Sequence, residues 1–350
     1  MAKTTKRKAF NLGGHEILPG EQRVITVPLS RLPDHTDMSL KVKVIHGERP
    51  GPTLFVSAAV HGDEIIGIEI IRRISKMKIL SRIKGTLIII PIVNRFGFLG
   101  QTRYLPDRRD LNRVFPGSRN GSSASQLAHT FMQTIVRHCD YGVDLHSGAV
   151  NRENLPQIRA NLGDPAVRDM AIAFRASVML NAKLRDGSLR GAADDLGCKM
   201  LVYEAGEALR FNEPAIRIGV RGVLGVIRHV GMLPKLKPRD SRIIPVQPDS
   251  SRWVRATSSG LMRAEVRLGD SVTAGQRVAM ISDPLGEADM EVYTKHAGVV
   301  IGRTNLPVVS RGDAMFHIAR VERPGQVEAT IDRRTANATS DPIFTGPEIV

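Results

Sequence analysis

Continuous apolar runs alternate with segments of helical periodicity between about residues 41 and 235. Thr53–Val60 (TLFVSAAV) and the segment 85–93 (GTLIIIPIV) are apolar throughout, which is typical of strands buried on both faces of a sheet. Between them, isoleucines recur at near-helical spacing from residue 65 to residue 74. Strands that alternate with helices predict an α/β sheet with helices on its faces.

The same reading assigns the other elements of this region. Residues 1–40 are expected to be an extended lead-in with several prolines. Strands are expected at 40–45, 53–60, 85–93, 141–146 and 200–204, and helices at 64–80, 125–139, 165–176, 188–196 and 209–232. Glycines at 219, 222 and 225 interrupt the last helical pattern.

The character of the sequence changes after residue 234. The segment 234–251 is rich in proline and charge, which marks a boundary. Beyond it, short β-like pieces are separated by glycines, without a long helical period, so we expect a small all-β barrel or sandwich. The predicted division is an α/β catalytic domain at 1–240, the β domain at 252–322 and a polar, mobile tail at 323–350.

Charge and composition limit the classes of function. The chain of 350 residues carries a net charge of +15, but only 4% of its residues are aromatic and it has no recognised nucleic-acid-binding motif. Several arginines fall within the segment 103–113, which favours a small anionic substrate over nucleic acid. Without a bilayer-length apolar stretch or a secretory signal, and with Cys139 and Cys198 expected to be reduced, we predict a cytoplasmic protein.

Three potential metal ligands follow or end apolar runs. His61 comes directly after the strand-like run 53–60, Glu64 lies at the start of the next helical pattern, and His146 ends another apolar stretch. Open α/β sheets bind ligands at the carboxyl ends of their strands. Two imidazoles and one carboxylate are the ligand set of a catalytic zinc, which keeps a further position open. We therefore predict one zinc ion per chain at His61, Glu64 and His146.

Other polar residues could complete a hydrolytic site. Glu204 ends the strand-like segment 200–204 and is the candidate proton acceptor, with Glu207 as its local competitor. Arg103 is the candidate group beside the oxyanion, and Asn112 with Arg113 could clamp a substrate carboxylate. Asp63 and Asp144 are adjacent to the ligands in sequence and are expected to orient them.

The order H-G-D-E (61–64), R-Y followed by D-L-N-R (103–113), D-L-H-S-G (144–148) and Y-E-A-G (203–206) resembles the succinylglutamate desuccinylase/aspartoacylase family, which is related to zinc carboxypeptidases. The resemblance implies a carboxypeptidase-like mixed sheet flanked by helices and a single zinc held by His61, Glu64 and His146. It also implies that Glu204 is the general acid/base, that Arg103 polarises the carbonyl and that Asn112 and Arg113 bind a carboxylate.

The resemblance leaves the substrate's second carboxylate unassigned. Aspartoacylases use a further arginine there, and Arg185 and Arg190 lie in the right region without aligning. The C-terminal part resembles the biotinyl/lipoyl-like barrel of many family members. Its tip region 286–291 has no lysine to carry a prosthetic group, so we expect a structural or gating module that shapes the cleft or a homo-oligomer interface.

Three functions are compatible with these residues. The first is a zinc amidohydrolase that deacylates an N-acyl amino acid or a similar small carboxylate. The second is a carboxypeptidase that acts on C-terminal, acidic peptide tails. The third is a non-catalytic binding protein, which the presence of all three ligands and Glu204 disfavours. A small-molecule partner is expected in the first case, and neither nucleic acid nor a membrane in any of them.

Overall fold

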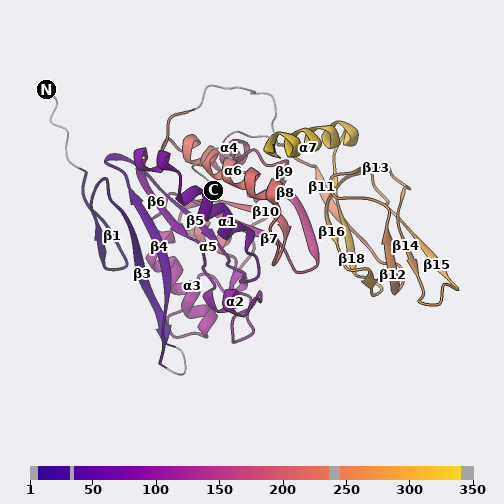
Figure 1. Cartoon of the computed structure of the whole chain (residues 1–350), viewed down its shortest axis with the longest axis horizontal. Helices are drawn as coiled ribbons and strands as arrows, with labels where there is room; N and C mark the ends of the chain where they lie inside the picture. Colours follow the sequence, from indigo (N-terminus) through magenta and orange to yellow (C-terminus); the bar gives the residue numbers. More distant parts are fainter. Residues whose placement is uncertain (1–6, 32–34, 236–244, 340–350) are drawn as a thin grey trace.

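The computed structural model describes residues 7–31, 35–235 and 245–339. Figure 1 shows an elongated molecule in which an α/β body occupies one end and a β-rich region the other. The N-terminal part of the described chain contributes a small hairpin of β1 (Phe10–Leu12) and β2 (His15–Ile17). No helix in the described ranges combines the length and hydrophobicity needed to span a bilayer.

A mixed sheet of 12 strands runs through the molecule. Its centre is parallel: β7 (Tyr141–Gly148) lies between β5 (Arg49–Ala58) and β10 (Lys199–Glu207). On one side follow β6 (Lys84–Ile90), β4 (Asp37–His46) and β3 (Gln22–Arg31), and on the other β8 (Arg152–Ala160) with β9 (Val178–Asn181). The predicted mixed α/β sheet is therefore confirmed.

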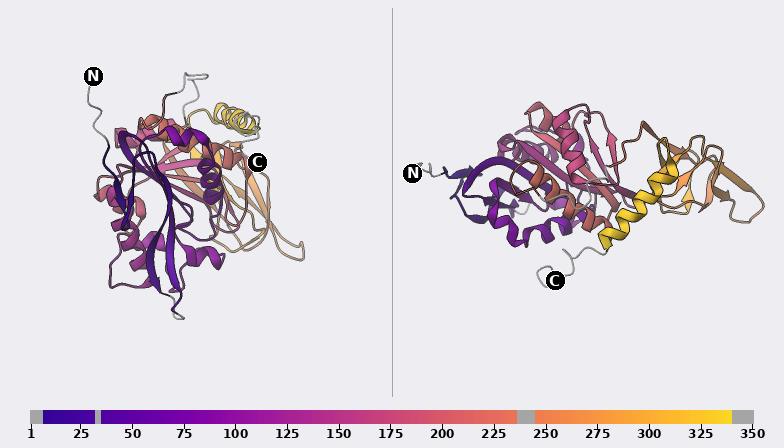
Figure 2. Two further views of the ribbon diagram at one scale, coloured as in Figure 1. Left: turned by 60° about the vertical axis from the view of Figure 1, so that its left-hand side comes forward. Right: turned by 90° about the horizontal axis from the view of Figure 1, so that it is seen from above.

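Helices cover both faces of this sheet (Figures 1 and 2). One buried cluster joins the sheet to α1 (Ile66–Ser75), α4 (Pro165–Phe174) and α6 (Glu213–His229). A second cluster on the other face joins it to α3 (Ser123–Thr134) and α5 (Leu189–Asp195). The three parallel strands are thus buried on both sides, as their continuous apolar sequences predict.

The glycines of α6 do not interrupt it. The helix runs unbroken from residue 213 to residue 229. At Gly222, a Cβ atom would lie 2.2 Å from the Phe174 ring, so the missing side chain is what lets α6 and α4 approach each other. The segment 209–212, expected to be helical, instead leads to the Asn212 cap, whose side chain accepts a hydrogen bond from the Ala215 backbone N–H.

The C-terminal strands continue the main sheet. The strand β16 (Gly298–Thr304) pairs with β8, and β18 (Ala314–Arg320) and β11 (Ser250–Arg255) follow. A second sheet packs against this extension over a separate hydrophobic core. It consists of β15 (Asp289–Tyr293), β14 (Arg277–Ser282), β12 (Gly260–Ala264) and β17 (Val308–Val309), while β13 (Ser271–Val272) pairs with β16. The small β sandwich that we predicted is present, but it shares its larger sheet with the α/β body.

Both terminal segments contain regular structure that the sequence did not predict. The lead-in contains β3, a 10-residue strand at the edge of the sheet, and residues 324–339 form the helix α7 (Pro324–Thr339) rather than a mobile tail. Ile331, Arg334 and Ala338 follow one face of α7 and are buried, because this face packs across α6, β13 and β16. The Arg334 guanidinium donates to the backbone oxygens of residues 175 and 176 just after α4. Residues 340–350 lie outside the described ranges.

Candidate metal centre and surrounding cavity

The candidate ligands meet at the carboxyl edge of the parallel strands. The turn that follows β5 carries His61, and β7 carries His146 near its end. The register aligns Ser57 with Asp144 and His146 with Glu204, so β5, β7 and β10 present their polar residues at the same edge. The arrangement follows the general rule for ligand sites in parallel sheets.

A tight turn brings His61 and Glu64 to the same side of the chain. Ala59 has a positive φ of 52°, which turns the backbone away from β5, and the Glu64 N–H donates to the His61 carbonyl at 3.1 Å. A Cβ atom at Gly62 would lie 1.9 Å from the Gly97 carbonyl carbon in α2 (Arg95–Leu99). Only glycine fits between these two backbones, so Gly62 allows the turn to pack where His61 needs it.

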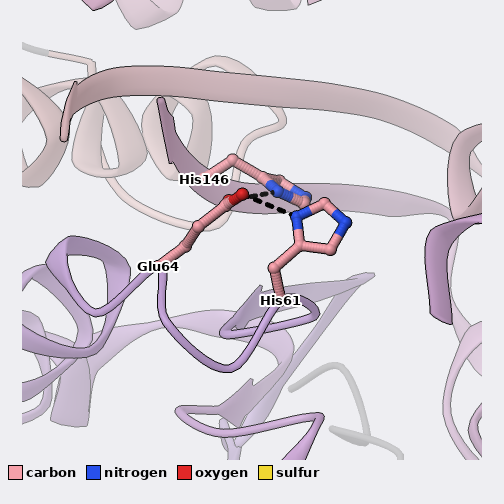
Figure 3. A group of neighbouring side chains, drawn as sticks. All are labelled: His61, Glu64 and His146. Carbon is pink, nitrogen blue, oxygen red and sulfur yellow. Dashed lines mark hydrogen bonds and ion pairs between the residues drawn. The ribbon is translucent and has the colours of Figure 1, made fainter. Parts of the chain in front are cut away.

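Two imidazoles and one carboxylate converge in the turn and on β7. Figure 3 shows the Glu64 carboxylate facing both rings, and the Nδ1 atoms of His61 and His146 are each 2.7 Å from one of its oxygens. One ligand atom from each residue lies within 4.8 Å of the others. All three residues are less than 5% exposed. The sequence prediction thus named three residues that the fold does bring together.

Carboxylates also hold the outer nitrogens of the two histidines. The His146 Nε2 atom is 2.6 Å from Asp144, which in turn accepts a hydrogen bond from the Ser57 hydroxyl at 2.7 Å. The His61 Nε2 atom is 3.1 Å from Asp110. This arrangement leaves both Nδ1 atoms facing the shared centre, as in metal sites where a carboxylate fixes the tautomer of a ligating histidine. The nitrogen and oxygen donors fit zinc.

The charges of the cluster are strongly coupled. Burial opposes charge on His146, but Asp144 and Glu64 raise its pKa well above the ordinary value. Burial also opposes charge on Glu64, yet the two histidines lower the pKa of this carboxyl.

Arg103 lies beside this cluster. Its guanidinium donates to Glu64 at 3.0 Å and to Asp110 at 3.0 and 3.2 Å. Arg103 and His61 together lower the pKa of Asp110 against the effect of burial. Arg103 therefore contacts a candidate metal ligand, Glu64. Through Asp110 it also contacts the carboxylate that holds His61.

Asn112 and Arg113 lie in a short 3-10 turn, Leu111–Arg113, at the cavity wall. The Asn112 side-chain oxygen accepts a hydrogen bond from the Leu189 backbone N–H at 2.9 Å, and Arg113 donates to the Asn112 carbonyl at 2.6 Å. Burial lowers the Arg113 pKa, and the charges of Arg185 and Arg103 lower it further. The guanidinium groups of Arg103, Arg113 and Arg185 therefore lie close together at this wall.

Glu204 lies in the cavity and Glu207 does not line it. The Glu204 carboxylate accepts a hydrogen bond from Asn154 at 3.0 Å and is 3.0 Å from the Arg159 Nε atom. Glu207 instead accepts from the Asn151 backbone N–H at 2.8 Å and from the Asn305 amide at 3.0 Å, contacts that join β10 to the neighbouring loops. Of the two candidates, only Glu204 is placed to reach a molecule in the cavity.

The cavity has a volume of about 400 Å³ and a strongly basic lining. Its arginines outnumber its carboxylates two to one: Arg103, Arg113, Arg152, Arg159, Arg185 and Arg190 against Glu64, Asp144 and Glu204. Trp253 of β11 closes one side, and the Arg152 guanidinium lies 5.5 Å from the centre of its ring. Arg185 and Arg190, the two candidates for binding a second substrate carboxylate, are both among the lining residues.

Sequence reasoning chose the wrong neighbour for one ligand. The Oδ1 atom of Asp63 has no hydrogen-bond partner in the described chain, so this atom does not hold a ring nitrogen of His61. Asp110 takes that role from a different loop, and its only sequence signal is its place directly before Leu111-Asn112-Arg113. The expectation for Asp144 agrees with its contact to His146. Asn154 and Arg159 were missed because they belong to β8, a strand that we did not predict.

This chain is similar in sequence to known proteins over much of its length. A profile of the succinylglutamate desuccinylase/aspartoacylase catalytic domain matches residues 50–230. The N-alpha-acetyl-L-2,4-diaminobutyric acid deacetylase of Halomonas elongata is 29% identical over 283 residues, which are 77% of this chain and 83% of that protein.

Solved structures share the fold over most of the chain. A succinylglutamate desuccinylase from Silicibacter sp. TM1040 superposes with a TM-score of 0.76 at 27% identity, covering 86% of this chain and 95% of that one. The product-bound ectoine utilization protein EutE of Ruegeria pomeroyi gives a TM-score of 0.77 at 24% identity, with coverages of 91% and 98%. Both likenesses extend beyond the profile match into the C-terminal region.

Proposed function

The chain belongs to the succinylglutamate desuccinylase/aspartoacylase family, and from this premise we propose that it is a zinc-dependent deacylase. It hydrolyses the amide bond of an N-acyl amino acid or a similar small carboxylate. The observation that carries the proposal is the buried cluster of His61, Glu64 and His146, which opens into a basic cavity that also holds Glu204.

The metal would be held by His61, Glu64 and His146, one ion per chain. Zinc in such a site supplies Lewis-acid polarisation of a carbonyl and makes water more acidic. Asp110 and Asp144 keep both Nδ1 atoms directed at the centre. The buried donors and their carboxylate partners support this assignment, because an outer carboxylate orients the ring of a ligating histidine and increases its basicity.

Glu204 would move the proton. As a carboxylate at the cavity wall, it takes a proton from the attacking water and returns it to the leaving nitrogen. Asn154 and Arg159 contact the Glu204 carboxylate and fix its position. Because the proton that Glu204 accepts is the one that it donates, the residue is regenerated in each turnover.

The arginines would bind and polarise the substrate. Arg103, adjacent to Glu64, supplies positive charge where the carbonyl oxygen becomes an oxyanion. Arg113 with Asn112 binds the substrate's carboxylate, since a guanidinium matches the geometry of that group. The excess of arginines over carboxylates in the lining favours a substrate with net negative charge.

The size of the cavity favours a small substrate over a peptide tail. A volume of about 400 Å³ lies at the lower end of the range of small-molecule sites. Trp253 and Arg152 lie against each other in the cavity lining. The Halomonas elongata relative is named for an N-acetylated amino acid, which supports the same substrate class. The alternative function is a carboxypeptidase that acts on acidic peptide tails, and a comparison of N-acyl amino acids with such peptides distinguishes the two.

We also propose the organisation that the sequence suggested: a catalytic domain at 1–240 followed by a β domain at 252–322. In this proposal the β domain is a structural module that shapes the cavity through Trp253. The two cysteines, Cys139 and Cys198, are free and buried, which agrees with a cytoplasmic protein.

The direct test measures amine release from a panel of N-acyl amino acids and poly-glutamate peptides. We expect turnover of at least one N-acyl amino acid and none of the peptides. Turnover of peptides alone would make the protein a carboxypeptidase, and failure of the zinc-loaded protein on the entire panel would remove the deacylase proposal.

Glu204→Gln should lower kcat by about 10²–10⁴-fold while zinc stays bound, because the amide cannot accept the proton. Glu207→Gln is the matched control on the same strand and should have the same kcat as the unchanged protein. Retained activity in Glu204→Gln would show that another group moves the proton. Zinc content, measured by elemental analysis, separates this outcome from loss of the metal.

A further inference from the structure

A second cavity lies in the C-terminal β sandwich, with a volume of about 430 Å³. Its apolar surface includes Val254, Val292 and Ile318, all part of or packed against the hydrophobic core between the two sheets. A volume of this size is within the range of small-molecule sites. The proposed deacylation uses none of these residues.

Basic side chains surround this apolar surface without any acidic counterpart. Arg252, Lys295 and Arg320 belong to the lining, which includes no aspartate or glutamate. In the described part of the chain no carboxylate forms an ion pair with any of the three. Cations grouped beside an apolar cavity favour an occupant that brings a negative charge.

Arg252 and Arg320 are exposed, and strand register places them on the strand face that carries the core residues. Arg252 is paired with Ile318, and Arg320 is paired with Ser250 on the same two strands. Because residues alternate between the faces of a strand, Arg252 and Arg320 share the face of Val254 and Ile318. A bound molecule could therefore contact the core residues and both guanidinium groups at once.

The cavity is also open to a ligand. Among the strands that the structure describes, β11 pairs only with β18, and β15 only with β14. Both edges border the cavity, since residues 250–255 and 292–293 line it. The sandwich is thus unclosed between β11 and β15, and a small molecule could enter there without breaking strand pairing.

We propose that this cavity is a binding site for an apolar monocarboxylate, an acid with a medium-length acyl chain or an aryl body. The carboxylate pairs with Arg252 and Arg320, since guanidinium groups match its geometry, and the apolar body lies on Val254, Val292 and Ile318. The site is distinct from the basic cavity at the metal cluster, which contains neither of these two arginines.

Trp253 is the strand neighbour of Arg252 and Val254 and offers an optical readout beside this site, while its own ring lies on the opposite face of β11, against His317 and Arg152. It is the only tryptophan of the chain, and it belongs to the lining of both cavities. Intrinsic fluorescence of the full-length protein therefore reports on one residue. Turnover is not needed for the measurement, so failure of the proposed deacylase activity would leave the test unaffected.

The experiment titrates the full-length protein with octanoate and follows Trp253 fluorescence. Octanol and octylammonium serve as ligands of similar length without the negative charge. We expect a saturable change with octanoate and at least tenfold weaker binding of the other two. Equal binding of octanol, or no saturable change with octanoate, would overturn the proposal.

Substitutions locate the binding. The double variant R252Q/R320Q should bind octanoate at least tenfold more weakly, whereas Arg311→Gln, an exposed arginine outside the cavity, should bind it like the unchanged protein. If octanoate occupied the catalytic cavity instead, Arg113→Gln would weaken binding and R252Q/R320Q would not, which also overturns the proposal. Circular dichroism checks that each variant is folded.

Discussion

At the scale of single residues, the orientation of two imidazole rings decides whether the cluster can hold a metal. Each histidine contacts Glu64 through Nδ1 and a different aspartate through Nε2. Asp144 is itself fixed by Ser57 from the neighbouring strand, so the orientation of His146 rests on the register of β5 and β7. The fold thus determines the tautomers on which metal affinity depends.

Asp144→Asn should weaken zinc binding by about 10–100-fold, because the amide no longer stabilises the Nε2 proton of His146. Competition with a chromophoric chelator measures the affinity. Asp169→Asn, on the exposed surface of α4, is the control and should leave the affinity unchanged. Equal zinc affinity in the Asp144 variant would mean that this contact does not support the metal.

We expect His317 to make the free energy of unfolding depend on pH. It is 5% exposed, stacks on Trp253 with ring centres 4.7 Å apart, and burial lowers its pKa to about 4. Because the unfolded histidine, with a pKa of about 6.5, binds a proton before the folded one does, stability falls as pH drops from about 6.5 toward 4. One pKa unit corresponds to about 1.4 kcal/mol, so the loss should be about 2–3 kcal/mol.

Urea unfolding at pH 7.5 and pH 4.5 tests this expectation. His317→Gln removes the titrating group and should lose about 2–3 kcal/mol less on acidification than the unchanged protein. The other titrating residues are common to both proteins, so their contributions cancel in the comparison. The same pH dependence in both proteins would exclude His317 as the source.

At the scale of elements, the turn between β5 and α1 links the fold to the site. His61 and Glu64 lie on this turn, and it packs directly on the backbone of α2 at Gly97. Gly62→Ala places a Cβ atom against that backbone, which no rotamer change can relieve. We expect a loss of about 1–3 kcal/mol in unfolding free energy, together with weaker zinc binding as the turn moves.

Thermal unfolding and zinc titration of Gly62→Ala measure the two effects. Gly325→Ala is the matched control, because a Cβ atom there meets nothing within 4 Å and lies in the first turn of α7. Unchanged stability and zinc affinity in Gly62→Ala would show that the turn tolerates displacement and that its close packing is not needed for the site.

The strands that continuous apolar runs could predict are those that are buried on both faces. Continuous apolar runs marked β5 and β6, and the metal ligands could be predicted because they follow or end such runs. By contrast, β8 reads RENLPQIRA and β3 contains Pro28, and neither has the apolar pattern of a central strand. Asn154 and Arg159, which contact Glu204, were missed with β8.

At the scale of the whole molecule, one sheet joins the candidate metal cluster to the C-terminal region. The pairing of β16 with β8 carries the sheet from the α/β body into the sandwich, and α7 packs across the same junction. Sequence composition marked the boundary near residue 250 but contained no signal for this pairing, because strand partners far apart in the chain leave no local pattern. Because of this pairing, Trp253 lines the basic cavity at the metal cluster.

Part of the net charge of +15 is concentrated in one place in the folded molecule. Arginines from three segments, 103–113, 152–159 and 185–190, meet in one cavity of the fold. Only the first of these segments could be associated with the site from sequence. An anionic substrate would meet a positive potential at the mouth of the cavity, which favours its association at low ionic strength.

The most direct test of the central claim is amine release by the full-length protein after removal of its metal and stepwise return of zinc. The account predicts no turnover without metal, and turnover that rises with added zinc up to one equivalent per chain, with His146→Ala inactive at every zinc concentration tested. Full turnover of an N-acyl amino acid by the metal-free protein, or by His146→Ala, would contradict it.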